Sequence, residues 1–345
     1  MILFSPITQK RIKRFKSIKR GYYSLIILVV AIFFSLFAEL IMNNRALVVH
    51  FADHYYFPVF KYYTASTFGM EGEGEADYRE LKRVLKAEDN ENYVVMPLIP
   101  YGPYESDFAM EGNPPYPPSR EHLLGTDDRG RDVLVRLFYG FRIAILFSLI
   151  LNIAAVTIGT FIGSFMGYFG GRFDIYSQRI IEVWSTVPML YLVIILASIF
   201  RPSFWLLLII LLLFQWITIT YYMRTEMYRE KSKDYAFSAR ASGASHMRIV
   251  FKHLLPNSLT PLITFFPFFI VAGISMLTSL DFLGYGLPVP TPSWGELMNQ
   301  ALLHLDKLWL SISPFAAIAI TLVLITFVGE ALREAFDPKE YSKYV

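Results

Sequence analysis

The segment FRIAILFSLILNIAAVTIGTFIGSFMGYF, residues 141–169, decides the fold class of this chain. Arg142 is its only charged residue, and most of the others are Leu, Ile, Val, Ala or Phe. A helix that crosses the hydrocarbon core of a bilayer needs about 20 predominantly apolar residues. The segment is longer than that, so it predicts a membrane-spanning helix.

Five more stretches of similar composition lie on either side of this segment. Lipid accepts only helices or closed barrels, and these stretches show no strand-like alternation of polar and apolar residues. We therefore predict an all-α membrane protein with about six transmembrane helices. The predicted spans are Tyr22–Met42, Phe141–Phe169, Ile180–Phe200, Phe204–Tyr222, Leu259–Leu280 and Ile312–Glu330.

The composition of the whole chain excludes several other protein classes. Of its 345 residues, 54% are hydrophobic and 18% are charged, which is too apolar for an ordinary soluble domain. The net charge of +3 is too small to attract nucleic acid over a distance. The absence of cysteine excludes disulfides, thiolate metal sites and a cysteine nucleophile.

The basic residues indicate how the chain is oriented. The leader KRIKRFKSIKR, residues 10–20, precedes an apolar stretch about as long as a full span, with no A-x-A site after it, which favours an uncleaved anchor over a cleaved signal peptide. With six spans, the leader, the 223–257 segment and the tail lie on one side. That side is predicted to be the cytoplasm because all three are basic. The basic residues of the last two are Arg224, Arg229, Lys231, Lys233, Arg240, Arg248, Lys252, Arg333, Lys339 and Lys343.

This topology divides the chain into five parts. They are a cytoplasmic leader (1–20), a first transmembrane helix (21–43), a periplasmic segment (44–138), a five-helix permease-like core (139–332) that contains the cytoplasmic segment 223–257, and a cytoplasmic tail (333–345). The periplasmic segment is far longer than a connecting loop. It is either a cap on the outer membrane face or a docking surface for an extracytoplasmic partner. Within it, Leu81, Val84 and Leu85 predict a short amphipathic helix over residues 76–86.

Three acidic residues, Asp127, Asp128 and Asp132, raise the question of a cation site. Their spacing does not fit an EF-hand loop, and Arg129 and Arg131 would neutralise them. We predict no metal site in this chain.

Four glycines, Gly159, Gly163, Gly167 and Gly171, recur every four residues near the end of the second span. On a helix they form one smooth stripe, and in lipid such stripes let helix backbones approach closely. This favours packing within the chain's own bundle over contact with a second subunit. The pattern does not identify the neighbouring helix.

Two acidic residues lie in or at the end of predicted spans. A carboxylate at the bilayer centre costs about 2.5–3.5 kcal/mol on insertion scales, so each needs a physical reason. Glu182, near a kink expected at Pro188, either pairs with Arg179 or faces a polar translocation path. Asp281 ends the fifth span and is a second candidate for that path, with snorkelling or local pairing as the alternative.

No motif of a hydrolase or a nucleotide-binding protein is present. The chain has no HExxH, GxSxG or GxxxxGK[ST] pattern, so we predict no enzymatic activity and no nucleotide site of its own. LGYG, residues 283–286, is similar to part of a potassium-channel filter. However, prolines follow at 288 and 290, and Phe282-Leu283 replaces the filter's Thr-Val, which argues against a channel.

The segment DYAFSARASGASHMRIVFKHLLPN, residues 234–257, separates two apolar runs with basic and small residues. Gly243 predicts a break between two helices, Ser245 predicts the cap of the second, and Pro256 predicts its end. The segment is either an interfacial helix on anionic lipid or a lever that passes work from a partner to the spans. The apolar face predicted for the second helix is Met247, Val250, Phe251 and Leu254, opposite Arg248 and Lys252.

The same segment resembles the EAA signature of ABC-importer permeases: EAA, three residues, Gly, nine residues, then I-x-L-P. It matches at Ala239, Gly243 and Leu255-Pro256, and departs at Phe237, Ser238 and His253. HLLGTDDRGRDVL, GGRFD, HLLPN, DFLGYGL and PTPSWGELM are similar to the C-type permeases of dipeptide and oligopeptide importers. Within that family, QRIIEVWSTVP and the long outer segment look most like the YejE-type group, whose members import oligopeptides and microcin C.

The resemblance implies the type I ABC-importer permease fold in the bacterial inner membrane. The implied partners are a homologous B-type permease, two cytoplasmic ATPase subunits or one fused ATPase, a periplasmic peptide-binding protein, the peptide substrate and membrane lipid. No cofactor is expected in this chain, since ATP and Mg would be bound by the ATPases, and no nucleic acid is expected. The residues expected to couple to the ATPases are Ser238, Ala239, Gly243, Ala244, Met247, Phe251, Leu255 and Pro256.

Two other function classes stay open. One is a secondary transporter driven by an ion gradient, with Glu182 and Asp281 as coupling acids, although the sequence shows no paired inverted repeats or unwound half-helices. The other is a membrane-anchored scaffold or sensor that uses the outer segment. Of the three classes, only the permease accounts for the 234–257 segment.

Overall fold

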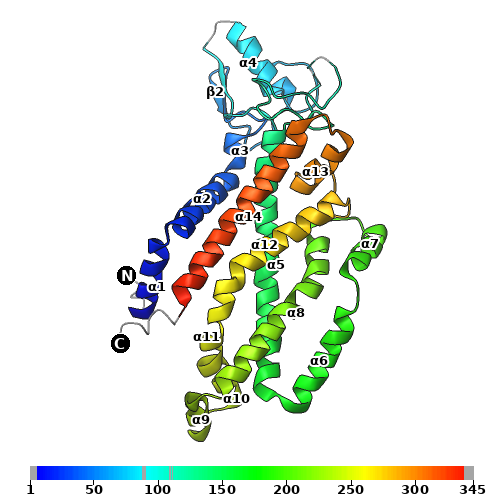
Figure 1. The fold of residues 1–345 in the computed structure, drawn as a ribbon. Coiled ribbons are helices and arrows are strands. Elements are labelled where there is room, and N and C mark those ends of the chain that lie inside the picture. Colours follow the sequence, from blue (N-terminus) through cyan, green and yellow to red (C-terminus); the bar gives the residue numbers. More distant parts are fainter. Residues whose placement is uncertain (1–5, 88–90, 109, 111, 338–345) are drawn as a thin grey trace. The chain divides into compact units, whose positions relative to one another are not determined.

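The computed structural model describes residues 6–87, 91–108, 110 and 112–337 (Figure 1). The chain forms two compact units. The first contains Met1–Leu28, Ala144–Pro288 and Ala319–Val345, and the second contains Val29–Ile143 and Val289–Ile318. The predicted tail residues Lys339 and Lys343 lie outside the described residues.

Five helices of the described chain are long and apolar enough to cross a membrane. They are α2 (Lys19–Leu36), α5 (Val133–Phe169), α8 (Phe204–Lys231), α12 (Thr260–Phe282) and α14 (Leu308–Phe336). A sixth apolar stretch consists of α6 (Gly171–Ser185) and α7 (Met189–Ile199), which are bent by 64° at the break between them (Figure 1). The break falls at Pro188, because proline has no N–H with which to continue a helix. Counted as one span, the pair gives the six that the sequence predicts.

Several helices extend beyond the apolar residues that predicted them. α5 begins at Val133 instead of Phe141, because the Asp132 carboxylate accepts the N–H of Val135 at 2.8 Å and so caps a polar first turn. α8 continues past Tyr222 to Lys231, because seven of the nine residues 223–231 are Met, Arg, Glu or Lys, which are good helix formers. The first transmembrane helix ends before the predicted Met42, since α2 stops at Leu36 and the short α3 (Ala38–Ile41) follows.

The core of the first unit joins α5, α7, α8 and α12. Its buried side chains include Phe147 and Leu151 of α5, Val193 of α7, Leu207 of α8 and Leu277 of α12. Polar groups also join these helices in the membrane-spanning region. The hydroxyl of Ser148 donates to the carbonyl of Ile270 at 2.7 Å, and the Asn152 amide donates to the carbonyl of Phe269 at 3.0 Å. Such bonds hold helices together where lipid offers no polar alternative.

The second unit contains a small antiparallel sheet, so the all-α prediction is incomplete. β1 (Val48–Phe51) lies between β2 (His54–Tyr56) and β3 (Tyr93–Val95). The hairpin turn is Ala52-Asp53, with φ of 49° and 61°. Such turns usually carry Asn-Gly or Asp-Gly, and the absence of glycine explains why the sequence did not reveal this one.

A helix and a 3-10 turn cover this sheet. α4 (Tyr78–Ala87) lies beside β3, and η1 (Ala65–Phe68) contributes Phe68 to the same core. The predicted helix is present and buries Leu81 and Leu85, but Val84 is 40% exposed and Tyr78 is buried with them. The remaining helices outside the 234–257 segment are α1 (Pro6–Ser17) and α13 (Trp294–Leu303).

Candidate functional site

The 234–257 segment folds into two helical parts separated by a tight turn. α9 (Asp234–Ala241) is followed two residues later by Gly243, whose φ of +77° lies in the left-handed region that favours glycine. The N–H of Gly243 donates to the carbonyl of Arg240 at 3.0 Å, and that of Ala244 donates to the carbonyl of Ala239 at 3.1 Å. These are the two bonds of a Schellman motif. Within the described chain no atom lies within 4 Å of a Cβ placed on Gly243, so this turn is open to a partner.

The second part begins at Ser245, as the sequence predicts. The Ser245 hydroxyl accepts the N–H of Arg248 at 3.4 Å. The chain continues without interruption through α10 (His246–Arg248), the π-helix η2 (Ile249–Leu254) and α11 (Leu255–Ser258).

The prediction of a single apolar face is wrong, because this part of the segment is a π-helix. Val250 and Leu254 are buried, whereas Met247 and Phe251 are 51% and 43% exposed. A π-helix has more residues per turn than an α-helix, so residues three and four apart no longer share one face. The apolar residues therefore divide into a buried row and an exposed pair.

Pro256 determines where the π-helix stops. Its last bond runs from the N–H of Leu255 to the carbonyl of Val250, and Pro256 has no N–H with which to continue it. The chain stays helical beyond this point, since Leu259 and Ile263 donate to the carbonyls four residues before them, each at 3.1 Å. The segment is thus joined to α12 without a loop, so a displacement of the segment is passed directly to a span.

The buried row packs on the ends of α5 and α8. Tyr168, Met227, Ala236 and Val250 belong to one cluster, and the Tyr168 hydroxyl lies 2.7 Å from Nδ1 of His246. The turn between α8 and α9 is fixed by Glu230, which is 2% exposed. Its carboxylate accepts hydrogen bonds from Lys233 at 2.7 Å and from the Tyr235 hydroxyl at 2.6 Å.

The residues predicted to couple to an ATPase differ in their accessibility. Ala239, Ala244 and Leu255 are half-buried, and the ring of Phe251 lies against Phe161 and Phe165 of α5, with centroids 6.2 and 6.1 Å away. The exposed residues of the predicted set are Ser238, Gly243, Met247, Phe251 and Pro256.

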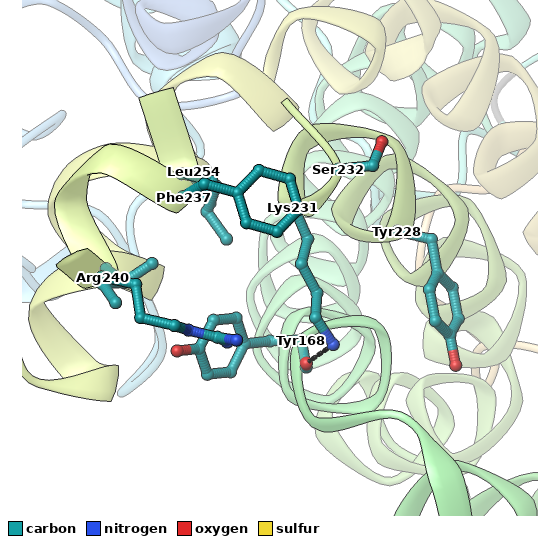
Figure 2. Close-up of a pocket in the computed structure, with 9 residues that line it drawn as sticks. Tyr168, Tyr228, Lys231, Ser232, Phe237, Arg240 and Leu254 are labelled. Carbon is teal, nitrogen blue, oxygen red and sulfur yellow. Dashed lines mark hydrogen bonds between the residues drawn. The ribbon is translucent and has the colours of Figure 1, made fainter. Parts of the chain in front are cut away.

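A cavity of about 240 Å³ lies between α9 and the ends of α5 and α8 (Figure 2). Sequence reasoning used its basic residues for orientation only and did not find this site. The sequence signal that could have revealed this site is Phe237, which replaces the glutamate of the EAA pattern and lies between the basic residues Lys231 and Arg240. The lining residues are Tyr168, Tyr228, Lys231, Ser232, Ala236, Phe237, Arg240, Ile249 and Leu254.

A second ionic cluster joins α6 to α8 near this cavity. Asp174, in the GGRFD motif, is 4% exposed and accepts two hydrogen bonds from Arg224, at 2.6 and 2.7 Å. It also accepts one from the Tyr228 hydroxyl at 2.8 Å. This cluster joins the last turns of α8 to the first turn of α6.

The glycine stripe packs on α8, the neighbour that the sequence left unidentified. A Cβ on Gly159 would lie 2.7 Å from the carbonyl oxygen of Trp216, on Gly163 2.4 Å from that of Thr220, and on Gly167 2.5 Å from that of Arg224. Gly171 does not belong to the stripe. It begins α6 with φ of +55° and has no described atom near its Cβ position, so it serves the turn after α5 and not helix packing.

The two candidate path residues lie in different surroundings. Glu182 of α6 is 47% exposed in its side chain and accepts a hydrogen bond from Arg179 at 2.6 Å. Asp281, at the end of α12, is buried, and its carboxylate accepts the N–H of Leu287 at 2.6 Å. Asp281 therefore stabilises the LGYGL turn in this structure.

Buried charges organise the second unit. Arg131 and Arg136 are 1% and 0% exposed, and both bond the Glu296 carboxylate. Arg131 also bonds Asp127 at 2.6 Å. Arg136 donates further to the carbonyls of Pro103 at 2.9 Å and Pro290 at 3.1 Å. The network thus joins the HLLGTDDRGRDVL and PTPSWGELM motifs, a link between distant residues that sequence reasoning missed.

His122 contacts two carboxylates in the same unit. Its Nδ1 lies 2.7 Å from Asp132 and its Nε2 lies 3.3 Å from Asp107, so both ring nitrogens face carboxylates. Burial by itself lowers the pKa of His122, but the two carboxylates outweigh burial and raise that pKa above its ordinary value. Among the described residues, no group of three or more His, Asp or Glu side chains is arranged to hold a metal ion.

Comparisons with known proteins agree with these observations. Residues 159–340 match the family described as "Binding-protein-dependent transport system inner membrane component". The chain is 43% identical over 342 residues to the inner membrane ABC transporter permease protein YejE of Escherichia coli K12, covering 99% of each chain. It is 38% identical to the peptidoglycan transport system permease protein YejE of Agrobacterium fabrum, covering 98% of this chain and 94% of the relative. It is 32% identical to the oligopeptide transport system permease protein OppC of Bacillus subtilis, covering 65% of this chain and 73% of the relative.

Proposed function

Because the chain belongs to the family of binding-protein-dependent transport system inner membrane components, as a YejE-type ABC transporter permease, we propose that it forms the peptide path of an ATP-driven importer. The observation that carries the proposal is the 234–257 segment. It is folded, joined to α12 without a loop, and exposes small and apolar residues at Ser238, Gly243 and Met247. The chain has no nucleotide-binding motif, so an ATP-driven importer would need another subunit to bind the ATP.

The proposed partners follow from this arrangement. Two ATPase subunits, or one fused ATPase, would bind ATP and Mg and contact the exposed turn at Gly243. Their movement would pass through the π-helix and Pro256 into α12. A homologous B-type permease would complete the path, and a periplasmic binding protein would deliver the peptide.

The proposed topology places the 234–257 segment and both termini in the cytoplasm. Support comes from the basic residues of the leader and of the 223–257 segment. The β1–β3 sheet with α4 would then lie in the periplasm. The sheet core is packed by its own residues, including Val49, Leu81 and Leu85, so it offers a formed surface to a binding protein.

The proposed path runs along α6. Arg179 and Glu182 are 73% and 47% exposed in their side chains, on a helix that is part of an apolar stretch. Charged groups that faced lipid at this level would be costly, so this side of α6 faces the path or the second permease.

A substitution at this pair tests the path. Glu182→Gln should keep the membrane level and lower peptide uptake about threefold or more, because the Arg179 charge is left unpaired on the path. Uptake into cells, normalised to the amount of permease, measures it. Unchanged uptake would remove Glu182 from the path.

The cargo has two candidates. The name of the Bacillus subtilis relative favours oligopeptides, and the name of the Agrobacterium fabrum relative favours peptidoglycan. Fragments of peptidoglycan that carry peptides would satisfy both. We therefore propose peptides as the shared class of cargo.

Uptake by the reconstituted complex tests the proposal. Proteoliposomes would hold this permease with its partner permease and ATPases, ATP inside, and binding protein with labelled cargo outside. Uptake should require hydrolysable ATP and survive ionophores that collapse ion gradients. Uptake that needs a gradient and no ATP would favour an ion-driven secondary transporter instead. Competition between unlabelled oligopeptide and unlabelled muropeptide then ranks the two cargoes.

A further inference from the structure

Two cations point into the cavity between α9 and the ends of α5 and α8. Figure 2 shows the guanidinium of Arg240 and the ammonium of Lys231 directed into the same hollow. Lys231 donates a hydrogen bond to the carbonyl oxygen of Tyr168, which carries no charge. In the described part of the chain, the Arg240 guanidinium has no hydrogen-bond or carboxylate partner. The lining of the cavity therefore offers two positive charges and no negative charge, with Arg240 exposed and Lys231 half-buried.

The nearby carboxylates are already paired with other groups. Asp174 binds Arg224 and Tyr228, and Glu230 binds Lys233 and Tyr235. None of the nine residues that line the cavity is acidic. An anion bound in this cavity would therefore come from outside the chain.

Position 237 shows why this chain lacks an internal anion. A glutamate there, as in the EAA pattern, would place a carboxylate on the wall of the cavity. Phe237 places an exposed ring there instead, and Ala236, Ile249 and Leu254 add further apolar surface. The cavity thus combines a cationic end with an apolar wall.

The level of the cavity in the membrane indicates the source of the anion. Tyr168 lies one residue before the end of α5, where an apolar span ends, and Lys231 lies beside it, since its ammonium donates to the Tyr168 carbonyl. Tyrosines are enriched at this depth, and basic pockets near span ends bind anionic lipid headgroups. A volume of 240 Å³ equals about eight waters at about 30 Å³ each, which is enough for a phosphate group.

We propose that this cavity binds the phosphate headgroup of an anionic membrane lipid, with Arg240 and Lys231 on the phosphate and Phe237 against the adjoining apolar part. Arginine recognises phosphate through two parallel N–H bonds, and lysine contributes a point charge. The bound lipid would hold α9 against the ends of α5 and α8, so it would stabilise the 234–257 segment. The inference does not depend on the cargo, and its test involves no transport.

Native mass spectrometry of the purified full-length chain tests lipid binding. Dioleoyl phosphatidylglycerol, dioleoyl phosphatidylcholine and inorganic phosphate are the probes. The wild type should retain phosphatidylglycerol in preference to phosphatidylcholine. Arg240→Gln should weaken that retention about fivefold, the effect of about one basic residue at a membrane surface. Arg240→Lys should restore most of it, which shows that the charge and not the fold is responsible.

Two further variants make the test specific. Phe237→Glu supplies a carboxylate to the cavity and should displace phosphatidylglycerol as strongly as Arg240→Gln does. Arg248→Gln removes a charge from an exposed side chain of the same segment, outside the cavity, and should leave retention unchanged.

Four results would overturn the proposal. An equal loss in Arg248→Gln would show diffuse attraction to the basic segment. Equal retention of phosphatidylcholine would show that no anion is recognised. Displacement of the lipid by millimolar inorganic phosphate would assign the cavity to a soluble anion. Retention unchanged in Arg240→Gln, together with loss of ATPase association, would assign the cavity to a carboxylate of the partner.

Discussion

Arg136 shows how single buried charges organise the second unit. Its guanidinium is fully buried and meets Glu296, Asp127 and the carbonyl oxygens of two distant loops. Removing one partner of such a network leaves a buried charge unpaired, which costs about 3–5 kcal/mol. The motifs around 122–136 and 290–296 therefore fix the fold of this unit.

His122 gives this unit a pH-dependent stability. Because its pKa is raised in the folded state, its contribution is fully present below the ordinary value of about 6.5 and is lost as the pH rises through the raised folded value. His122→Gln should destabilise the protein by about 1–3 kcal/mol at pH 6 and by less at pH 9. Thermal unfolding of the purified chain at both pH values measures the difference.

A control separates this effect from general pH dependence. His54→Gln changes an exposed histidine of the β1–β2 hairpin and should change the unfolding temperature little. A His122→Gln penalty that grows with pH would contradict the assignment.

Single-residue chemistry was only partly predictable from sequence. Ser245 was predicted to cap a helix because a serine before an apolar run has one dominant local role. The Arg136–Glu296 contact was not predicted, since it joins residues 160 positions apart and only the fold brings them together. Lys231 and Arg240 served only the prediction of orientation, since the cavity that they line with Tyr168 exists only in the folded chain.

The packing of α5 on α8 is the most specific contact between elements. Carbonyl oxygens of α8 lie only 2.4–2.7 Å from where the Cβ atoms of Gly159, Gly163 and Gly167 would be, so any side chain forces the helices apart. Close approach of backbones is the main source of helix association in lipid.

Gly163→Ala should therefore weaken this contact. A Cβ 2.4 Å from the carbonyl oxygen of Thr220 requires a backbone shift, for which about 1–3 kcal/mol of destabilisation is expected. Heating in detergent, followed by the recovery of monodisperse protein, measures it. Thr157→Ile adds volume to the exposed side of α5 and should be neutral. Equal recovery of Gly163→Ala and wild type would contradict the account.

Elements were predictable where one physical property dominates. The spans follow from apolar length, and the bend before α7 follows from Pro188. The β1–β3 sheet was missed because its strands are three or four residues long and its turn lacks glycine. The π-helix was missed because no side-chain pattern in the sequence distinguishes it from an α-helix. The role of Pro256 in ending it is visible only in the structure.

At the scale of the whole molecule, the chain is a permease that depends on another subunit for energy. Its family is established by similarity along nearly the full length, and the direction of transport and the cargo are proposals. The central mechanical claim is that ATPase movement enters at the Gly243 turn and reaches α12 through one continuous helical path.

Two glycine variants test this claim most directly. Gly243 and Gly69 have φ of +77° and +72°, and neither has a described atom within 4 Å of its Cβ position. Aspartate tolerates such a conformation better than most residues, so Gly243→Asp and Gly69→Asp impose similar strain at different sites. Each would be reconstituted with the partner permease, the ATPases and the binding protein, and ATP-driven peptide uptake and ATPase retention would be measured. The account predicts that Gly243→Asp loses about tenfold or more of both, equivalent to at least about 1.4 kcal/mol of association, while Gly69→Asp keeps both. Wild-type uptake and ATPase retention in Gly243→Asp would contradict it.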